Sequence, residues 1–146
     1  MNSIIYILLS VLFSFSFSAD STIDNCVNFS VNTDREVYFS GENLFLELDV
    51  KVENGFHIYS VDPSKSLASS YVEILDTTLF SIIGIMHEPE AKTKFDSTFN
   101  MDVYYHENKI KLIQDLKLSN EIQKGEYIVN SIFHYYACNP TFCVPK

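Results

Sequence analysis

The stretch from residue 43 to residue 52, NLFLELDVKV, alternates apolar and mostly polar side chains. Leucine or valine occupies every even position from 44 to 52, and Phe45, Glu47, Asp49 and Lys51 lie between them. Successive side chains of a β-strand point to opposite faces of its sheet, whereas a helix repeats every 3.6 residues. This pattern therefore predicts a strand with one face in a core and one face in water.

Further strand-like segments follow, separated by turn sequences such as ENG, DPS, HEN and QKG. They are GFHIYSV, YVEIL, LFSIIGI, MDVYY, KIKLIQDLKL and EYIVNSIFHYYAC. No segment carries an apolar stripe at helical spacing over the length of a helix. About seven short strands at this spacing predict an all-β fold, an immunoglobulin-like antiparallel β-sandwich. Because the chain has no tryptophan, the Cys-Trp-Cys pattern of antibody domains is absent.

The amino-terminal segment has the character of an export signal. Residues 1–19 carry no charged side chain, and an apolar run of about 14 residues extends from Ile4 to Phe17. This run is shorter than the roughly 20 apolar residues that span a membrane, and small residues follow it. We expect residues 1–19 to be a signal peptide and residues 20–146 to form one exported domain, in a compartment where disulfides persist.

Charge and motifs exclude several functions. The net charge of −9 and the single arginine, Arg35, argue against a nucleic-acid partner. The sequence lacks a Gly-x-Ser-x-Gly nucleophile elbow, which removes support for hydrolase chemistry. One Cys-x4-Cys pair with scattered histidines is a weak zinc signature, so we expect neither a metal nor another cofactor.

Two cysteines stand close together in YYACNPTFCVPK, residues 135–146. The predicted last strand, Glu126 to Ala137, runs directly into Cys138, and Cys143 follows after the four residues NPTF. Facing positions across a tight turn lie about 4.5 to 5.5 Å apart at Cα, which suits a disulfide. Such a short loop contributes only about 2 kcal/mol by the chain-entropy estimate. Spacing alone leaves a structural staple, a redox pair and a metal clip open, and it favours the staple.

The environment of these thiols predicts modest intrinsic reactivity. Nothing places them at a helix amino terminus, and the nearby basic residues are only His134 and Lys146. We therefore expect no strong depression of the pKa of either thiol. The pair would be a poor attacking group by itself, but a partner with an activated Cys-x-x-Cys thiolate could attack it through a mixed disulfide.

Three segments together resemble a known family. GFHIYSVDP at 55–63, HEPEAKTKFD at 87–96 and YYACNPTFCVP at 135–145 are similar, in order and spacing, to the amino-terminal periplasmic domain of DsbD-type transmembrane thiol:disulfide interchange proteins. The resemblance implies an immunoglobulin-like thiol:disulfide oxidoreductase domain in the periplasm. It implies a relay of reducing equivalents from a membrane-embedded thiol reductase domain, in cis or in trans, to thioredoxin-fold periplasmic proteins, as in cytochrome c biogenesis.

The resemblance also implies roles for individual residues. Cys138 and Cys143 match the redox pair, with Cys143 entering the mixed disulfide and Cys138 resolving it. An aromatic cap loop would shield the disulfide, with Phe99 as the better candidate for the shielding ring and Phe95 as the second. Asp96 in the same loop would take up or relay a proton during exchange.

Two features depart from the family pattern. Phe56 stands where the family commonly has tryptophan, a change that keeps an apolar ring. The family continues after Cys-x-Pro with a further strand and usually with membrane helices and a thioredoxin-like domain. The domain would then lack its last strand, and the chain would be either a fragment or a free-standing version that finds its reductant in trans.

Several side chains have both a structural and a functional interpretation. Tyr59, His134 and Tyr136 are candidates for the redox surface, although aromatic residues in strands are more often cross-strand packing partners. His57 is interpreted as a packing or hydrogen-bonding histidine inside a strand. The remaining two histidines, His87 and His106, are expected in solvated loops.

Cys26 is the third cysteine, and a disulfide to it would give the chain a different function. We expect it in a mobile segment, outside any intramolecular bridge. A bridge from Cys26 to Cys138 or Cys143 would instead close a long loop and act as a staple. The alternative function is accordingly an exported immunoglobulin-like binding module with a purely structural disulfide.

Overall fold

A computed structural model describes residues 26–97 and 99–146. The expected signal peptide, residues 1–19, lies outside this range. Within it the regular structure consists of eleven strands, and no described helix is long and apolar enough to cross a membrane. The strands are β1 (Val27–Thr33), β2 (Asn43–Val52), β3 (His57–Tyr59), β4 (Tyr71–Ile74), β5 (Phe80–His87), β6 (Lys92–Asp96), β7 (Met101–His106), β8 (Lys109–Leu118), β9 (Ser131–His134), β10 (Tyr136–Cys138) and β11 (Cys143–Pro145).

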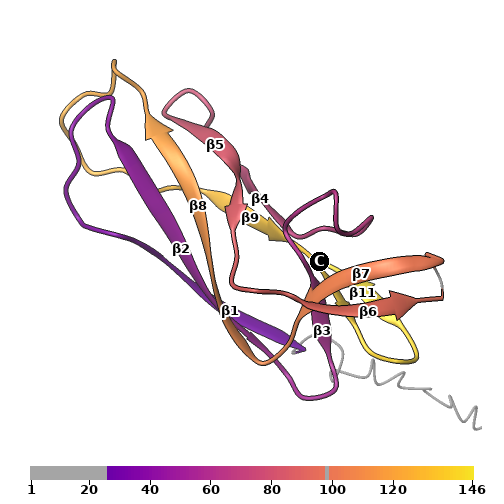
Figure 1. The fold of residues 1–146 in the computed structure, drawn as a ribbon. Helices are drawn as coiled ribbons and strands as arrows, with labels where there is room; N and C mark the ends of the chain where they lie inside the picture. The colour runs from indigo at the N-terminus through magenta and orange to yellow at the C-terminus, as the bar shows by residue number, and fades with distance from the viewer. Residues whose placement is uncertain (1–25, 98) are drawn as a thin grey trace, which may run out of the picture.

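These strands pair antiparallel into two layers (Figure 1). One layer is a four-stranded sheet in the order β1-β2-β8-β5. The other contains the five-stranded sheet β11-β10-β3-β7-β6 and the short pair β4-β9, which joins it because a single residue, Tyr135, separates β9 from β10. The predicted all-β, immunoglobulin-like sandwich is confirmed.

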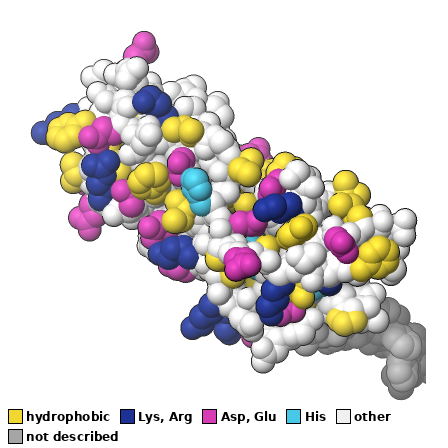
Figure 2. Space-filling model, viewed as in Figure 1, with side chains coloured by type: hydrophobic (Ala, Val, Ile, Leu, Met, Phe, Trp, Pro, Cys, Tyr) yellow, Lys and Arg dark blue, Asp and Glu magenta, His cyan; other side chains and the backbone are white. Residues whose placement is uncertain are grey.

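The core follows from the alternation that the sequence shows. In β2 every apolar even position from 44 to 52 is buried, and β8 matches it with Leu112, Leu116 and Leu118. Leu48 lies opposite Leu112 in the pairing register, while charged side chains such as those of Glu47 and Lys111 pair on the other face, 2.7 Å apart. Figure 2 shows acidic and basic side chains interspersed over the visible face.

The predicted last strand is wrong in its extent. Residues 126–130 are not strand, and the remainder is divided at Tyr135. The break marks a change of partner, because β9 pairs with β4 whereas Tyr135 exchanges two backbone hydrogen bonds with Lys146, at 2.9 and 3.1 Å. A single apolar pattern therefore spans two short strands that belong to different ladders.

The sequence does not predict β1 and β6, two strands at sheet edges. Only Val27 of β1 is buried, and every residue of β6 is exposed or half-buried. Edge strands of this kind are specified by backbone pairing with a neighbour, which leaves little periodicity in the side chains.

Candidate redox site

A hairpin at the rim of the five-stranded sheet holds the two cysteines. Cys138 ends β10 and Cys143 begins β11, and the two residues are direct register partners joined by a disulfide with Cα atoms 4.0 Å apart. Asn139 shapes the turn, since its side-chain oxygen accepts the backbone N–H groups of Thr141 and Phe142 at 2.8 and 2.9 Å. Its own N–H donates to the Phe142 carbonyl at 2.9 Å. Asparagine side chains commonly close turns in this way, so NPTF brings the cysteines together.

The two cysteines differ in exposure. Cys138 is only 1% exposed, whereas Cys143 is an exposed residue of the edge strand. Ala137 and Ile58 point into the sandwich core, so alternation directs Cys138 and Tyr59 to the opposite face of the sheet. A second small cluster covers Cys138 on that face; it consists of Tyr59, Ala68 and Val103 together with the partly buried Phe99, Met101 and Tyr105.

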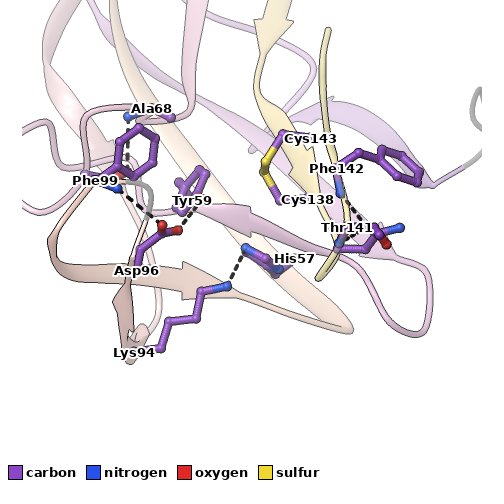
Figure 3. Close-up of a disulfide and its surroundings, with 12 residues drawn as sticks. His57, Tyr59, Ala68, Lys94, Asp96, Phe99, Cys138, Thr141, Phe142 and Cys143 are labelled. Atoms are coloured by element: carbon purple, nitrogen blue, oxygen red, sulfur yellow. Dashed lines mark hydrogen bonds between the residues drawn. A yellow bond between two sulfur atoms is a disulfide. The ribbon is translucent and has the colours of Figure 1, made fainter.

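The loop between β6 and β7 supplies part of this cover (Figure 3). Tyr59 donates a hydrogen bond from Oη to Asp96 Oδ2 at 3.1 Å, and the backbone N–H of Phe99 donates to Asp96 Oδ1 at 3.4 Å. The rings of Tyr59 and Phe99 meet edge to face with centroids 6.0 Å apart. Burial, followed by the hydrogen bond to Asp96, raises the pKa of Tyr59 to about 12. Tyr59 is therefore a protonated donor at neutral pH.

A histidine lies next to Cys138 on the other side from Cys143. His57 of β3 is the register partner of Cys138, and Lys94 Nζ lies 2.9 Å from His57 Nε2. The imidazole contacts the rings of Tyr59 and Tyr105 edge to face, with centroids 5.4 and 5.2 Å away. Burial, together with the charge of Lys94, lowers the pKa of His57 to about 4. The imidazole is thus neutral at pH 7.

The structure brings some of the predicted site residues together and separates others. Phe99 and Asp96 lie beside Tyr59 in the cover over Cys138. Phe95 is 62% exposed and alternates with Asp96, so its ring points to the other face of β6. Tyr136 is an exposed residue of β10, on the same face as Cys138 by alternation.

His134 is held elsewhere. Its Nε2 lies 2.9 Å from Glu73 Oε2, and its ring stacks on Tyr71 of β4 with centroids 4.6 Å apart. These contacts place it in the β4-β9 ladder, whereas the disulfide belongs to the ladder of β10 and β11.

Two expectations about single residues are wrong. His106 is 3% exposed at the end of β7, where its Nε2 lies 2.8 Å from Glu88 Oε2, so it does not occupy a solvated loop. Cys26 is 2% exposed and packs in the main core beside β1, so the part of its expectation that placed it in a mobile segment is wrong. Because Cys143 is the disulfide partner of Cys138, neither of these two cysteines bridges to Cys26.

The model of the family described as thiol:disulfide interchange protein DsbD, N-terminal, matches residues 29–146, a range that includes the whole site. The chain belongs to this family. Comparisons with curated proteins and with solved structures found no match. Membership in the DsbD N-terminal family confirms the resemblance seen in the sequence, and thiol:disulfide interchange is the chemistry of that family.

Sequence reasoning missed the closeness of His57 and Lys94 to the cysteines of this DsbD N-terminal domain. The signal was present in part, because His57 alternates with Tyr59 and Lys94 alternates with Asp96. What the sequence lacked was the pairing of β3 with β10, which places His57 beside Cys138. Among residues 26–97 and 99–146, no group of three or more His, Cys, Asp or Glu side chains is arranged to hold a metal ion.

Proposed function

We propose that this domain relays reducing equivalents by reversible exchange at the Cys138–Cys143 disulfide, in the periplasm, with thioredoxin-fold proteins as partners. The observation that carries the proposal is the unequal exposure of the two cysteines, with Cys143 at the edge and Cys138 beneath a cover of aromatic rings. A partner thiolate must approach a disulfide sulfur directly, so access selects which sulfur it attacks. Access favours Cys143.

The reaction is a pair of exchanges. A thiolate of the partner dithiol attacks Sγ of Cys143, a partner–Cys143 bond forms, and the Cys138–Cys143 bond breaks to release the Cys138 thiolate. The second partner thiol then attacks its own bonded sulfur and releases Cys143. The partner is oxidised to a disulfide, this domain gains two electrons as a dithiol, and protons pass to the released thiolates.

We propose one role for each of two residues in the cover over the disulfide. Phe99 excludes water and small thiols from the Cys138 side while leaving the Cys143 side open. Asp96, which binds Tyr59 at the edge of the same cluster, serves as the proton carrier. The expected electron source is a membrane-embedded thiol reductase domain in cis or in trans, and the reduced Cys143 thiolate then attacks the disulfide of a thioredoxin-fold acceptor.

The assignment of Cys143 is tested with single-cysteine variants. A thioredoxin-fold protein whose Cys-x-x-Cys is changed to Cys-x-x-Ser, loaded as an activated mixed disulfide, is offered to Cys138→Ser and to Cys143→Ser. The exposed thiol of the Cys138→Ser variant is expected to form the stable protein–protein adduct, whereas Cys143→Ser forms little. Equal or absent adducts from the two variants would contradict the proposal.

A further inference from the structure

A row of register partners leads across the sheet from the disulfide to His57, whose side chain contacts a lysine. Cys143 lies opposite Cys138, Cys138 lies opposite His57, and His57 Nε2 lies 2.9 Å from Lys94 Nζ. Directly opposed residues in a sheet project their side chains to the same face. Figure 3 shows His57 between the Lys94 ammonium and Cys138.

The contact with Lys94 fixes the state of the imidazole. A lysine ammonium only donates hydrogen bonds, so His57 Nε2 must be the acceptor. A neutral imidazole carries its single proton on the other nitrogen, which makes Nδ1 the donor. Burial and the nearby ammonium lower the pKa of His57 to about 4, in agreement with the neutral form.

The charges that face His57 come from β6 and from the turn that follows β7. Lys94 and Asp96 belong to β6, Glu107 follows β7, and both carboxylates oppose the effect of Lys94 on the imidazole. The tyrosine rings of Tyr59 and Tyr105 complete the surroundings, and Lys94 Nζ lies 5.0 Å from the centroid of Tyr105. Lys94 is thus the cation that contacts His57, and the ring face of Tyr105 helps to hold it.

We propose that His57 and Lys94 act together to stabilise the Cys138 thiolate at the moment when exchange expels it. The inference rests on the proposed function and names two residues that assist it. When the partner sulfur bonds to Cys143, the electron pair of the breaking disulfide goes to Cys138. His57 meets this charge with its Nδ1–H, and Lys94 acts through His57 as a positioning residue that fixes the tautomer and contributes positive charge. No proton needs to leave either group.

The experiment measures how fast dithiothreitol reduces the disulfide of the full domain at pH 7. Lys94→Met and His57→Phe are each expected to slow the reaction about three- to tenfold, since a less stabilised thiolate leaves more slowly. Lys94→Arg keeps the charge and the donors, so it is expected to restore most of the rate. Lys109→Met removes one charge from the opposite sheet and is expected to leave the rate unchanged.

A double variant separates a coupled pair from two independent packing effects. If Lys94 acts through His57, Lys94→Met combined with His57→Phe is no slower than the slower single variant. A second measurement follows the thiolate absorbance of Cys138 against pH in a Cys26→Ala, Cys143→Ser background, where Lys94→Met is expected to lower the thiolate fraction at pH 7 by about three- to tenfold. Thermal unfolding of each oxidised variant identifies any that has lost its fold, and Lys94→Gln then replaces Lys94→Met.

Rates and thiolate fractions that match the wild type in the folded Lys94 and His57 variants would overturn the inference, as would fully additive effects in the double variant. The proposed function fails in a different way, because a wild-type disulfide that resists dithiothreitol would refute the relay itself.

Discussion

At the scale of single residues, Glu88 holds together the ends of two strands behind the redox site. Its carboxylate accepts hydrogen bonds from Ser60 Oγ at 2.6 Å and from the Val61 N–H at 2.9 Å, and it lies 2.8 Å from His106 Nε2. Burial raises the pKa of Glu88, but these hydrogen bonds outweigh burial and leave the pKa below its ordinary value of 4.5. The carboxylate is therefore better stabilised in the folded chain than in the unfolded one.

The lowered pKa of Glu88 predicts how the stability of the fold changes with pH. Because the folded pKa is depressed, the stability from Glu88 is complete above its unfolded pKa and is lost as pH falls through the folded value. Glu88→Gln is expected to cost about 1–3 kcal/mol at neutral pH. Urea unfolding at successive pH values should show the gap between wild type and variant closing below the ordinary value of 4.5. A gap that stays constant with pH would contradict this account.

Phe99 is the side chain that we propose to shield Cys138 from water and small thiols. If Phe99 shields Cys138 as proposed, Phe99→Ala opens the cover, and reduction of the disulfide by glutathione is expected to accelerate severalfold. Phe95→Ala is the matched control, because this ring lies in the same segment but is 62% exposed and points away from the cluster. Stopped reactions analysed for free thiols supply the rates. Equal acceleration in both variants would show that loosening of the loop, rather than loss of the Phe99 ring, is responsible.

At the scale of elements, the hairpin formed by β10 and β11 sets the geometry of the dithiol. Asn139 organises its turn through two accepted backbone hydrogen bonds. When the disulfide is reduced, we expect these bonds to help the pairing of β10 with β11 keep Cys138 and Cys143 opposed. The turn therefore contributes to how readily the disulfide reforms.

Asn139→Ala tests that contribution. Loss of about 1 kcal/mol of turn stability makes the opposed dithiol less populated, so the equilibrium with glutathione is expected to shift about fivefold toward the reduced form. Thr141→Ala is the control, because Thr141 contributes to the turn through its backbone N–H. An unchanged equilibrium constant in Asn139→Ala would mean that the flanking strand pairs fix the hairpin without the turn.

The sequence predicts some of the strands and misses others. The bounds of β2 match NLFLELDVKV because one solvated face imposes alternation, and β8 matches KIKLIQDLKL. The pairing of Cys138 with Cys143 also agrees with the expectation from the short turn. The edge strands β1 and β6, the break at Tyr135 and the approach of His57 to Cys138 depend on which strands pair, and local sequence does not encode that choice.

At the scale of the whole molecule, we expect the fold of the sandwich to depend little on the disulfide. The core lies between the two layers, whereas the disulfide closes a hairpin on the outer face of one sheet. Reduction should therefore lower the free energy of unfolding by only about 2 kcal/mol. A core truncation such as Leu112→Ala, at a fully buried position, is expected to cost about 2–5 kcal/mol. Chemical denaturation of oxidised, reduced and Leu112→Ala protein compares these values, and a reduced form that is unfolded in water would contradict the independence.

The central claim is that Cys138 and Cys143 interconvert between disulfide and dithiol while the sandwich stays folded. A redox titration of the wild-type domain in glutathione buffers, followed by thiol counting and near-ultraviolet circular dichroism, tests it most directly. The account predicts a single two-electron transition above about −300 mV with the aromatic signal of the fold retained. A transition below that potential, or loss of the aromatic signal on reduction, would identify the disulfide as a structural staple.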